Sequence, residues 1–316
     1  MGPIRLGIVG VGKIARDHHI PSVVGNPSYQ FTAVSSRNSQ TPGVRNFHSI
    51  GEMLAQLPDL DAVSICTPPQ LHYEAARLAL TSGRHVLLEK PPCTSLTQLR
   101  HLESLATVHA VTLYQTWHSQ HAHGVAPAAQ LLRQHELKNI RVTWKEDVRM
   151  WHPGQTWIWQ AGGFGVFDIG FNPLSILTRL IEEPIFASAA TLYVPANCET
   201  PIAATANLDT PSGVEILLEL DFRHTGTQTW DIDMETDGGA LKLAAGGGRL
   251  MRDNVPVPID ESNLASEYRS IYRRFAELVA QKRSEVDASP MQLVADIFLI
   301  ANRIAVEPFL DSARAT

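Results

Sequence analysis

A short apolar strand that runs directly into a glycine turn opens the chain, Leu6-Gly-Ile-Val-Gly-Val-Gly-Lys-Ile-Ala15. This strand–turn–helix pattern is typical of a dinucleotide-binding fold. Gly10 would permit the tight turn, Gly12 would let backbone N–H groups approach a pyrophosphate, and Ala15 would pack the helix on the strand. The N–H groups at that helix N-terminus favour phosphate charge. A turn that only packs a helix on a strand would look the same.

The residues after the next predicted strand, 31–36, bear on which dinucleotide is bound. A site selective for NAD carries an acid there, which holds the ribose 2′-hydroxyl. This chain has Ser36 and Arg37 instead. A hydroxyl beside a guanidinium suits the 2′-phosphate of NADP, so we expect NADP to be preferred and NAD to remain usable. The alternative is a solvated surface arginine.

Length and composition favour two domains and a small-molecule partner. The 316 residues carry a formal net charge of −6, which leaves no basic surface for nucleic acid. Three cysteines lie far apart, which argues against a disulfide framework and a thiolate metal site. We see no leader and no apolar stretch of membrane-spanning length, so we expect a cytoplasmic protein without a membrane partner.

Residues 1–117 alternate strands with helices, which predicts a doubly wound parallel sheet, a Rossmann domain. Capping-box patterns mark two of the helix starts, at Ser49 with Glu52 and at Ser95 with Gln98. Further predicted strands and helices cover residues 50–57, 61–66, 70–83, 85–89, 95–109 and 111–116. Ligand is expected at the carboxyl ends of the strands.

Residues 118–316 predict an α+β domain with a mostly antiparallel open sheet and helices on one face. The predicted strands are 140–144, 186–194, 201–208, 214–222, 229–236 and 240–244, and the helices are 124–135, 168–181, 263–281 and 291–306. The last helix could pack back near the N-terminal domain. A homodimer through the C-terminal sheet is compatible with this architecture.

One constellation that could carry chemistry is Glu89-Lys90-Pro91-Pro92, at the end of a predicted strand. A lysine held between a dry wall and a nicotinamide cation has its ammonium form disfavoured. Its pKa can then fall towards the working pH, so Lys90 could exchange protons. The alternative is a solvated charge at a strand end.

A second constellation is the run from Gly162 to Asn172. Four-residue spacing puts Asp168 and Asn172 on one helix face, where they could bind neighbouring hydroxyls or orient a proton acceptor. The alternative is a capping aspartate and a surface asparagine. Because Pro173 lacks an N–H group, we expect this helix to start late or to bend.

A third constellation is aromatic and lies in a loop rich in glycine and proline. Trp151, His152, Trp157 and Trp159, together with the distant Trp230, offer flat faces with polar edges. Such faces suit a sugar, which has an apolar C–H face and a hydroxyl rim. Tryptophans that only fill the core are the alternative, although loops often carry sites.

Three further histidines, His118, His121 and His123, crowd the predicted domain junction. Their spacing matches neither a strand face nor a helix face for all three, and no cysteine or carboxylate joins them. We therefore expect no metal site.

Four motifs in order resemble the Gfo/Idh/MocA oxidoreductases, a family grouped as glucose-fructose oxidoreductase, inositol dehydrogenase and rhizopine catabolism protein. They are Gly10-Val-Gly-Lys-Ile-Ala15, Thr67-Pro-Pro69, Glu89-Lys90-Pro91 and Gly165-Val-Phe-Asp168. Within the family, the chain is similar to bacterial aldose 1-dehydrogenases for L-arabinose and D-galactose, almost throughout, to about Phe309. The motifs of that subgroup are Lys13-Ile-Ala-Arg-Asp17, Thr116-Trp-His118, Trp144-Lys-Glu-Asp-Val148, Trp151-His-Pro-Gly-Gln155 and Asp168-Ile-Gly-Phe-Asn172.

The resemblance implies that Lys90 and Asp168 occupy catalytic positions. Many family members have a histidine four residues after the aspartate, where this chain has Asn172. Because an amide is no general base near neutral pH, the proton would pass to Lys90, helped or replaced by Asp168, while Asn172 would position the sugar.

The implied reaction oxidises an aldopyranose, L-arabinose or D-galactose, at C1 to the aldonolactone, with hydride transfer to nicotinamide C4. Residues expected to bind the cofactor are Gly10, Gly12, Lys13, Ile14, Ser36, Arg37, Thr67, Pro68, His72, Glu89 and Lys90. Those expected to bind the sugar are Lys90, His118, Trp151, His152, Asp168, Asn172 and Trp230. The same fold also serves non-enzymatic dinucleotide-binding sensors and NAD-dependent glycosidases, which are the alternatives.

Overall fold

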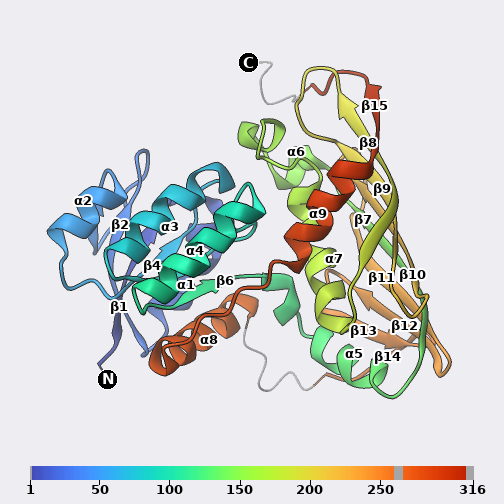
Figure 1. Cartoon of the computed structure of the whole chain (residues 1–316), viewed down its shortest axis with the longest axis horizontal. Coiled ribbons are helices and arrows are strands. Elements are labelled where there is room, and N and C mark those ends of the chain that lie inside the picture. The colour runs from blue at the N-terminus through green and yellow to red at the C-terminus, as the bar shows by residue number, and fades with distance from the viewer. Residues whose placement is uncertain (1, 260–265, 311–316) are drawn as a thin grey trace. The chain divides into compact units, whose positions relative to one another are not determined.

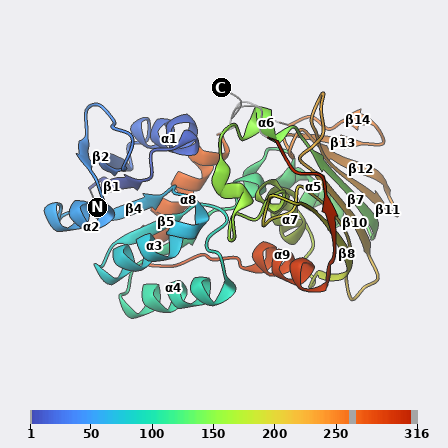
Figure 2. The ribbon, with the colours of Figure 1, turned by 90° about the horizontal axis from the view of Figure 1, so that it is seen from above.

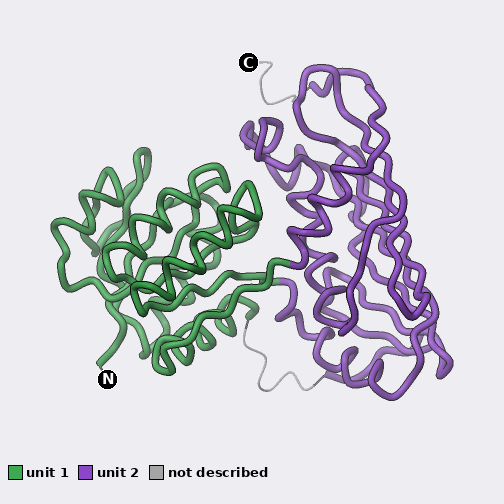
Figure 3. Tube along the Cα trace, in the orientation of Figure 1, with its two compact units in different colours: residues 1–118, 265–288 green, residues 119–264, 289–316 purple. Residues whose placement is uncertain are grey.

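The computed structural model describes residues 2–259 and 266–310, which form two compact units (Figure 3). Unit 1 comprises residues 1–118 and 265–288, and unit 2 comprises residues 119–264 and 289–316. The predicted boundary after Trp117 therefore does not separate the units completely. The later segment joins unit 1 because α8 (Glu267–Gln281) buries apolar side chains against that unit's strands, Tyr272 and Phe275 among them.

Unit 1 contains a six-stranded sheet in the order β3-β2-β1-β4-β5-β6, with every neighbouring pair parallel. Its strands are β1 (Ile4–Val9), β2 (Tyr29–Ser35), β3 (Arg45–Phe47), β4 (Ala62–Ile65), β5 (His85–Leu88) and β6 (Leu113–Gln115). This order and direction confirm the predicted doubly wound sheet. Its fully buried strands read as apolar runs because helices cover both faces.

The helices of unit 1 begin close to where their sequence signals predict. They are α1 (Ile20–Val24), which continues a π-helical turn (Ala15–His19), then α2 (Ile50–Gln56), α3 (His72–Thr81), α4 (Leu96–Val108) and α8. Ser49 accepts a hydrogen bond from the backbone N–H of Glu52, and Ser95 accepts one from Gln98, which confirms both caps. Figure 2 shows α3 and α4 on one side of the sheet and α1 and α8 on the other.

Unit 2 is built on a nine-stranded sheet in the order β14-β13-β12-β11-β7-β10-β9-β8-β15. Its strands are β7 (Leu137–Lys145), β8 (Phe186–Pro195), β9 (Ala203–Asp209), β10 (Glu215–Asp221), β11 (Thr229–Thr236), β12 (Gly239–Ala244), β13 (Arg249–Arg252), β14 (Val255–Pro256) and β15 (Asn302–Val306). Only the β7–β10 and β8–β15 pairs are parallel, so the predicted mostly antiparallel sheet is confirmed. The helices α5 (Val125–Leu132), α6 (Val148–Trp151), α7 (Phe167–Leu180) and α9 (Ser289–Ile300) lie on one side of it (Figure 1).

The predicted extent of the last helix is wrong. The helix predicted over 291–306 ends at Ile300, and Asn302–Val306 is a strand beside β8. The open edge of β8 offers unpaired backbone groups, which outweigh the weak helical pattern of this short segment. The helical part, α9, packs on α7 and β8 within unit 2.

The predicted late start of the helix around Asp168 is also wrong. α7 begins at Phe167 and runs through Pro173 without interruption. A proline removes one backbone hydrogen bond, but eleven residues of this helix are buried, and their packing outweighs that loss.

Candidate functional site

The glycine turn after β1 has the geometry of a phosphate-binding loop. Gly10 has a φ of +89°, and a Cβ atom on it would lie 2.8 Å from the Thr67 side chain and 2.9 Å from the Thr67 backbone nitrogen. A Cβ on Gly12, by contrast, would meet no atom within 4 Å. The loop is therefore closed on the Thr67 side and open above Gly12. Thr67 Oγ1 is buried and has no hydrogen-bond partner among the described residues, so these residues fit a bound dinucleotide phosphate.

The residues predicted to read the ribose lie beside this loop. The backbone N–H of Gly10 donates to the carbonyl of Ser35, which directly precedes Ser36 and Arg37. Ser36 is partly buried and Arg37 is exposed. Lys13 forms an ion pair with Asp17 on the exposed face of the same turn. The structure thus brings the predicted 2′-phosphate residues next to the predicted pyrophosphate loop.

His72 supports this region from within. It is fully buried, and its ring nitrogens face the backbone carbonyls of Thr67 and of Pro91, the latter at 2.9 Å. Burial lowers the pKa of His72. The side chain therefore joins the Thr67-Pro68 loop to the segment that follows Lys90, and any effect on a nucleotide would act through these loops.

The Glu89-Lys90 pair follows β5 and is tied to α8. Glu89 is 3% exposed, and its Oε2 accepts a 2.9 Å hydrogen bond from the backbone N–H of Lys90. Its Oε1 accepts from the hydroxyl of Tyr268 at 2.9 Å and lies 3.0 Å from His19 Nε2. Burial opposes charge on Glu89, but the hydrogen bond and the charge of His19 outweigh it and lower the pKa to about 2.

His118 is the other predicted sugar contact in unit 1. Its Nδ1 lies 2.6 Å from Glu267 Oε2, at the start of α8, and its ring stacks on Tyr268 with 5.8 Å between centroids. A single helix therefore positions both His118 and, through Tyr268, the Glu89-Lys90 segment.

Unit 2 gathers a second group of polar side chains around Glu146, directly after β7. The indole N–H of Trp230, in β11, donates to Glu146 Oε2 at 2.8 Å, and His152 Nε2 lies 3.1 Å from Glu146 Oε1. Glu146 is 2% exposed, so these two partners replace water at a buried carboxylate. Glu146 was not among the predicted site residues, although it stands within the Trp144-Lys-Glu-Asp-Val148 motif.

His152 connects this carboxylate to Asp168. The single turn of α6, capped by Asp147, carries the chain back so that His152 faces Glu146. Because a carboxylate only accepts hydrogen bonds, the proton on the neutral ring belongs on Nε2, which leaves Nδ1 as an acceptor. Nδ1 is buried without a hydrogen-bond partner among the described residues and lies 3.9 Å from Asp168 Oδ2. His152 Nδ1 and Asp168 Oδ2 are therefore two neighbouring acceptors, and either could accept a hydrogen bond from a ligand hydroxyl.

The position of Asp168 depends on the glycine-rich run before α7. Gly165 has a φ of +57°, and a Cβ atom on it would lie 2.2 Å from the carbonyl oxygen of Pro201. This close contact sets where α7 begins and places Asp168 in its first turn, 5% exposed. Asn172 lies one turn later on the same face, as predicted.

An aromatic wall flanks these polar groups. Trp151 packs edge-on against Trp230 with 5.0 Å between ring centroids and is 38% exposed. Trp230 also stacks on Trp144, its register partner in β7. Trp151, His152, Asp168 and Trp230 thus lie in one neighbourhood of unit 2, whereas Lys90 and His118 belong to unit 1.

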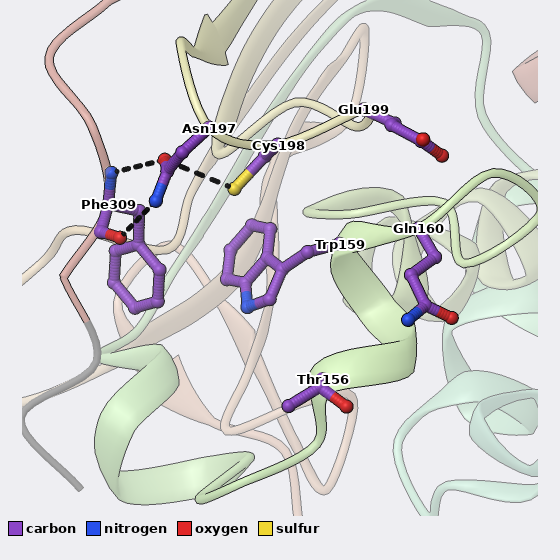
Figure 4. Close-up of a pocket in the computed structure, with 7 residues that line it drawn as sticks. All are labelled: Thr156, Trp159, Gln160, Asn197, Cys198, Glu199 and Phe309. Carbon is purple, nitrogen blue, oxygen red and sulfur yellow. Dashed lines mark hydrogen bonds between the residues drawn. The ribbon is translucent and has the colours of Figure 1, made fainter. Parts of the chain in front are cut away.

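A separate pocket in unit 2, of about 260 Å³, contains none of the predicted site residues. Figure 4 shows its lining, which consists of Thr156, Trp159, Gln160, Asn197, Cys198, Glu199 and Phe309. The Asn197 amide exchanges two hydrogen bonds with the backbone of Phe309, at 2.8 and 2.9 Å. Trp159, from the predicted aromatic loop, faces Phe309 here, with 4.7 Å between the ring centroids.

Metal-binding and membrane-spanning features were also sought. Across residues 2–259 and 266–310, no three His, Cys, Asp or Glu side chains are grouped so that they could hold a metal ion. Within the same ranges, no helix is long and apolar enough to cross a membrane.

Comparison with known proteins places the chain in a family. Residues 4–116 match the Gfo/Idh/MocA family model, described as an oxidoreductase family with an NAD-binding Rossmann fold. The galactose 1-dehydrogenase of Pseudomonas fluorescens is 41% identical over 98% of this chain and 100% of its own length. The chain belongs to the Gfo/Idh/MocA oxidoreductases.

Solved structures agree with this assignment. A D-galactose-1-dehydrogenase from Rhizobium etli matches this Gfo/Idh/MocA oxidoreductase with a TM-score of 0.92 and 45% identity, covering 98% of this chain and 99% of that one. A 3-ketoreductase from Actinomadura kijaniata, solved with NADP, matches with a TM-score of 0.84 at 21% identity over 96% of this chain and 100% of that one, and so shares the fold. The chain is therefore an oxidoreductase with a dinucleotide-binding Rossmann domain.

Proposed function

We propose that this protein oxidises an aldopyranose, D-galactose or L-arabinose, at C1 to the aldonolactone with NADP or NAD. The observation that carries the proposal is the buried row Glu146–His152–Asp168 beside the Trp151–Trp230 wall. A sugar presents an apolar C–H face and a rim of hydroxyl donors, which such a surface complements. The likeness to galactose 1-dehydrogenases supports the choice of sugar.

Each group in unit 2 has a distinct part in sugar binding. Trp151 and Trp230 pack on the apolar face of the ring, while Asp168 and His152 Nδ1 accept hydrogen bonds from hydroxyls. Glu146 holds His152 in the tautomer that leaves Nδ1 free to accept. Asn172 supplies an amide that both donates and accepts, and it fixes the orientation of the ring.

The proton of the C1 hydroxyl passes to Lys90, with Asp168 as the alternative acceptor. His118 contributes a further contact to the sugar. When bound, the nicotinamide supplies the hydride acceptor. Gly10, Gly12, Lys13 and Ile14 hold the pyrophosphate, and Ser36 and Arg37 favour the 2′-phosphate of NADP, because a charge-assisted hydrogen bond replaces the acid that would exclude it.

The exposed edge of the nine-stranded sheet supports a homodimer through unit 2. Ile304 in β15, opposite Tyr193, and Phe186 in β8, opposite Asp209 of β9, are each 46% exposed although both strands are paired at these positions. Light scattering of the purified protein tests this part of the proposal, and a monomer would contradict it.

The decisive experiment is incubation of the protein with NAD or NADP and a panel of aldoses, with reduced nicotinamide followed by absorbance. We expect turnover with D-galactose and L-arabinose, which share their configuration from C1 to C4, and formation of the lactone. Tight dinucleotide binding without turnover of any sugar would support the sensor instead. Release of an aglycone from a glycoside without net reduction would support the NAD-dependent glycosidase.

A further inference from the structure

Unit 1 contains a buried polar cluster that the proposed chemistry does not explain. We define it as His19, Ser64, Glu89, Tyr268 and Tyr272, whose exposed fractions lie between 0% and 3%. They come from the π-helical turn, β4, the end of β5 and α8. Burying a carboxylate and an imidazole is costly unless each is fully hydrogen-bonded, so this cluster calls for a functional or structural reason.

The hydrogen bonds converge on Glu89 and pass from it to Lys90. Glu89 Oε1 faces His19 Nε2 at 3.0 Å and accepts from the Tyr268 hydroxyl at 2.9 Å, while Oε2 accepts from the Lys90 backbone N–H at 2.9 Å. The second nitrogen of His19, Nδ1, lies 2.8 Å from the Tyr272 hydroxyl and 3.1 Å from Ser64 Oγ. Both ring nitrogens therefore face oxygen atoms that can accept a hydrogen bond.

This geometry suits a charged imidazole. Burial disfavours charge on His19, but Cys66 and Tyr272 and the hydrogen bond to Glu89 outweigh it and raise the pKa well above its ordinary value. The 3.0 Å approach of His19 Nε2 to the Glu89 carboxylate favours the same state, an imidazolium–carboxylate pair. The other titratable groups that act on this pair are His18, Cys66, Lys90 and His118, and Glu267 acts on the neighbouring His18 and Tyr268.

The charge of Glu89 matters for the protonation of Lys90, because the two residues are adjacent in the chain and interact electrostatically. A carboxylate beside a lysine stabilises the ammonium form. That would oppose the task proposed for Lys90, which must lose its proton before it can accept one from the sugar. A positive charge on the far side of Glu89 offsets this effect.

We propose that His19 is a positioning residue, whose imidazolium, together with the Tyr268 hydroxyl, holds Glu89 against the Lys90 backbone and neutralises it, so that Lys90 can lose its proton near neutral pH. This inference rests on the proposed function, in which Lys90 is the proton acceptor. His19 and Tyr268 touch neither the sugar nor the reacting atoms and act through Glu89.

The main test is His19→Gln, which keeps an N–H donor towards Glu89 but removes the charge. Two readouts are needed. One is the pH dependence of kcat with NADP and D-galactose. The other needs no turnover: competitive acylation of the full-length protein across pH, with peptide mass spectrometry, reports the pKa of Lys90 directly. The exposed Lys282 serves as the internal reference in the same digest.

We expect His19→Gln to move both the kcat limb and the Lys90 acylation curve to higher pH by about one unit, because Glu89 is then unneutralised. Lys282 should be unchanged, and the KM values for sugar and NADP should stay within about twofold, since no binding contact is lost. A folded His19→Gln protein with an unmoved Lys90 acylation curve would overturn the proposal and leave the cluster a purely structural feature.

Matched tyrosine variants guard against a general loss of stability. Tyr268→Phe removes one donor to Glu89, whereas Tyr29→Phe removes an equally buried hydroxyl that donates to the Tyr272 carbonyl at 2.6 Å. Tyr268→Phe should shift the Lys90 curve in the same direction as His19→Gln, and Tyr29→Phe should not. Equal shifts in both, or none in Tyr268→Phe, would contradict the proposal even if His19→Gln does not fold.

The two readouts separate this inference from the proposed function. If the wild-type protein oxidises no aldose, the proposed function fails, but the acylation curves still decide whether His19 controls Lys90. If the wild-type protein is active but the Lys90 acylation curve is the same in His19→Gln and Tyr268→Phe as in the wild type, the inference alone is wrong.

Discussion

Trp230 donates its indole N–H to the buried carboxylate of Glu146 at 2.8 Å, across 84 residues of sequence. The two meet because β11 pairs antiparallel with β7, and Glu146 directly follows β7. The same carboxylate faces His152, so one buried charge fixes an aromatic face and an imidazole together. The sugar proposal therefore predicts that Glu146 matters as much as the residues that would touch the sugar.

Glu146→Gln should lower the catalytic efficiency with sugar without weakening the binding of the cofactor. The amide keeps an oxygen for Trp230 but no longer holds His152 in one tautomer, so we expect kcat/KM for D-galactose to fall roughly 10–150-fold, for a loss of about 1.5–3 kcal/mol. Kinetics with both substrates measure it. The control is Glu219→Gln on β10, which removes a carboxylate that is 30% exposed and pairs with Lys145. It should change neither kcat/KM for D-galactose nor the KM for NADP by more than twofold.

Removal of the aromatic wall should raise the KM for sugar. Trp151→Ala takes away a face that is 38% exposed, and Trp230→Ala also removes the donor to Glu146. We therefore expect the larger rise in Trp230→Ala, measured by initial rates at saturating NADP. If cofactor affinity fell while sugar affinity stayed, the wall would be misassigned.

Arg37→Ala should distinguish the two dinucleotides. Loss of a charge-assisted contact to the 2′-phosphate is expected to weaken NADP by roughly 1.5–3 kcal/mol and NAD much less. Fluorescence titration of both cofactors checks this. Equal losses for both would mean that Arg37 is the solvated surface arginine considered as the alternative.

The identity of the proton acceptor can be read from the pH profile. Because an ordinary lysine is protonated near pH 7, Lys90 can accept a proton only if its environment favours the neutral form, and kcat should then rise with pH. Lys90→Met should abolish that rise and lower kcat by about 10²–10⁴-fold while NADP still binds. If Asp168→Asn alone removed the limb and Lys90→Met preserved it, Asp168 would be the acceptor.

Acid stability should depend partly on Asp61, which receives two side-chain hydrogen bonds from Arg5, each 3.0 Å long. The hydrogen bond from Arg5 lowers the pKa of Asp61 in the folded protein. The stabilisation is therefore present above the pKa of the unfolded chain, about 3.9, and is lost as pH falls through the lower folded value. Both side chains are nearly two-fifths exposed, so Arg5→Ala should lower the free energy of unfolding only slightly at pH 6, and by less still near pH 3. Urea unfolding of both proteins at both pH values measures this loss of stability. A loss that grows in acid would contradict the stabilising role of the ionised Asp61.

The sequence alone predicts the architecture of the first 118 residues well. Apolar runs, capping boxes such as Ser49 with Glu52, and the glycine turn at Gly10 are local signals, and each acts within about ten residues of chain. The same is true of Asp168 and Asn172, whose four-residue spacing alone places them on one helix face. Local patterns suffice where local hydrogen bonds and dihedral preferences decide the structure.

Those patterns fail where distant segments compete or cooperate. Asn302–Val306 reads as the end of a helix, but the free edge of β8 makes it a strand. α8 joins unit 1 because its buried face completes a core whose other members lie some 150 to 270 residues earlier, a match that no local period reveals. Pro173 predicts a late helix start, and the burial of α7 overrides it.

The site shows the same division. Sequence motifs single out Lys90, Asp168, His152 and Trp230 because residues of these types can exchange protons or contact a sugar. Only the tertiary structure shows that Glu146 joins Trp230 to His152 and that His19 faces Glu89 next to Lys90. The reason is physical: sequence determines which groups can ionise or donate, but the protonation state and partner of a buried group depend on what burial brings within about 3 Å of it.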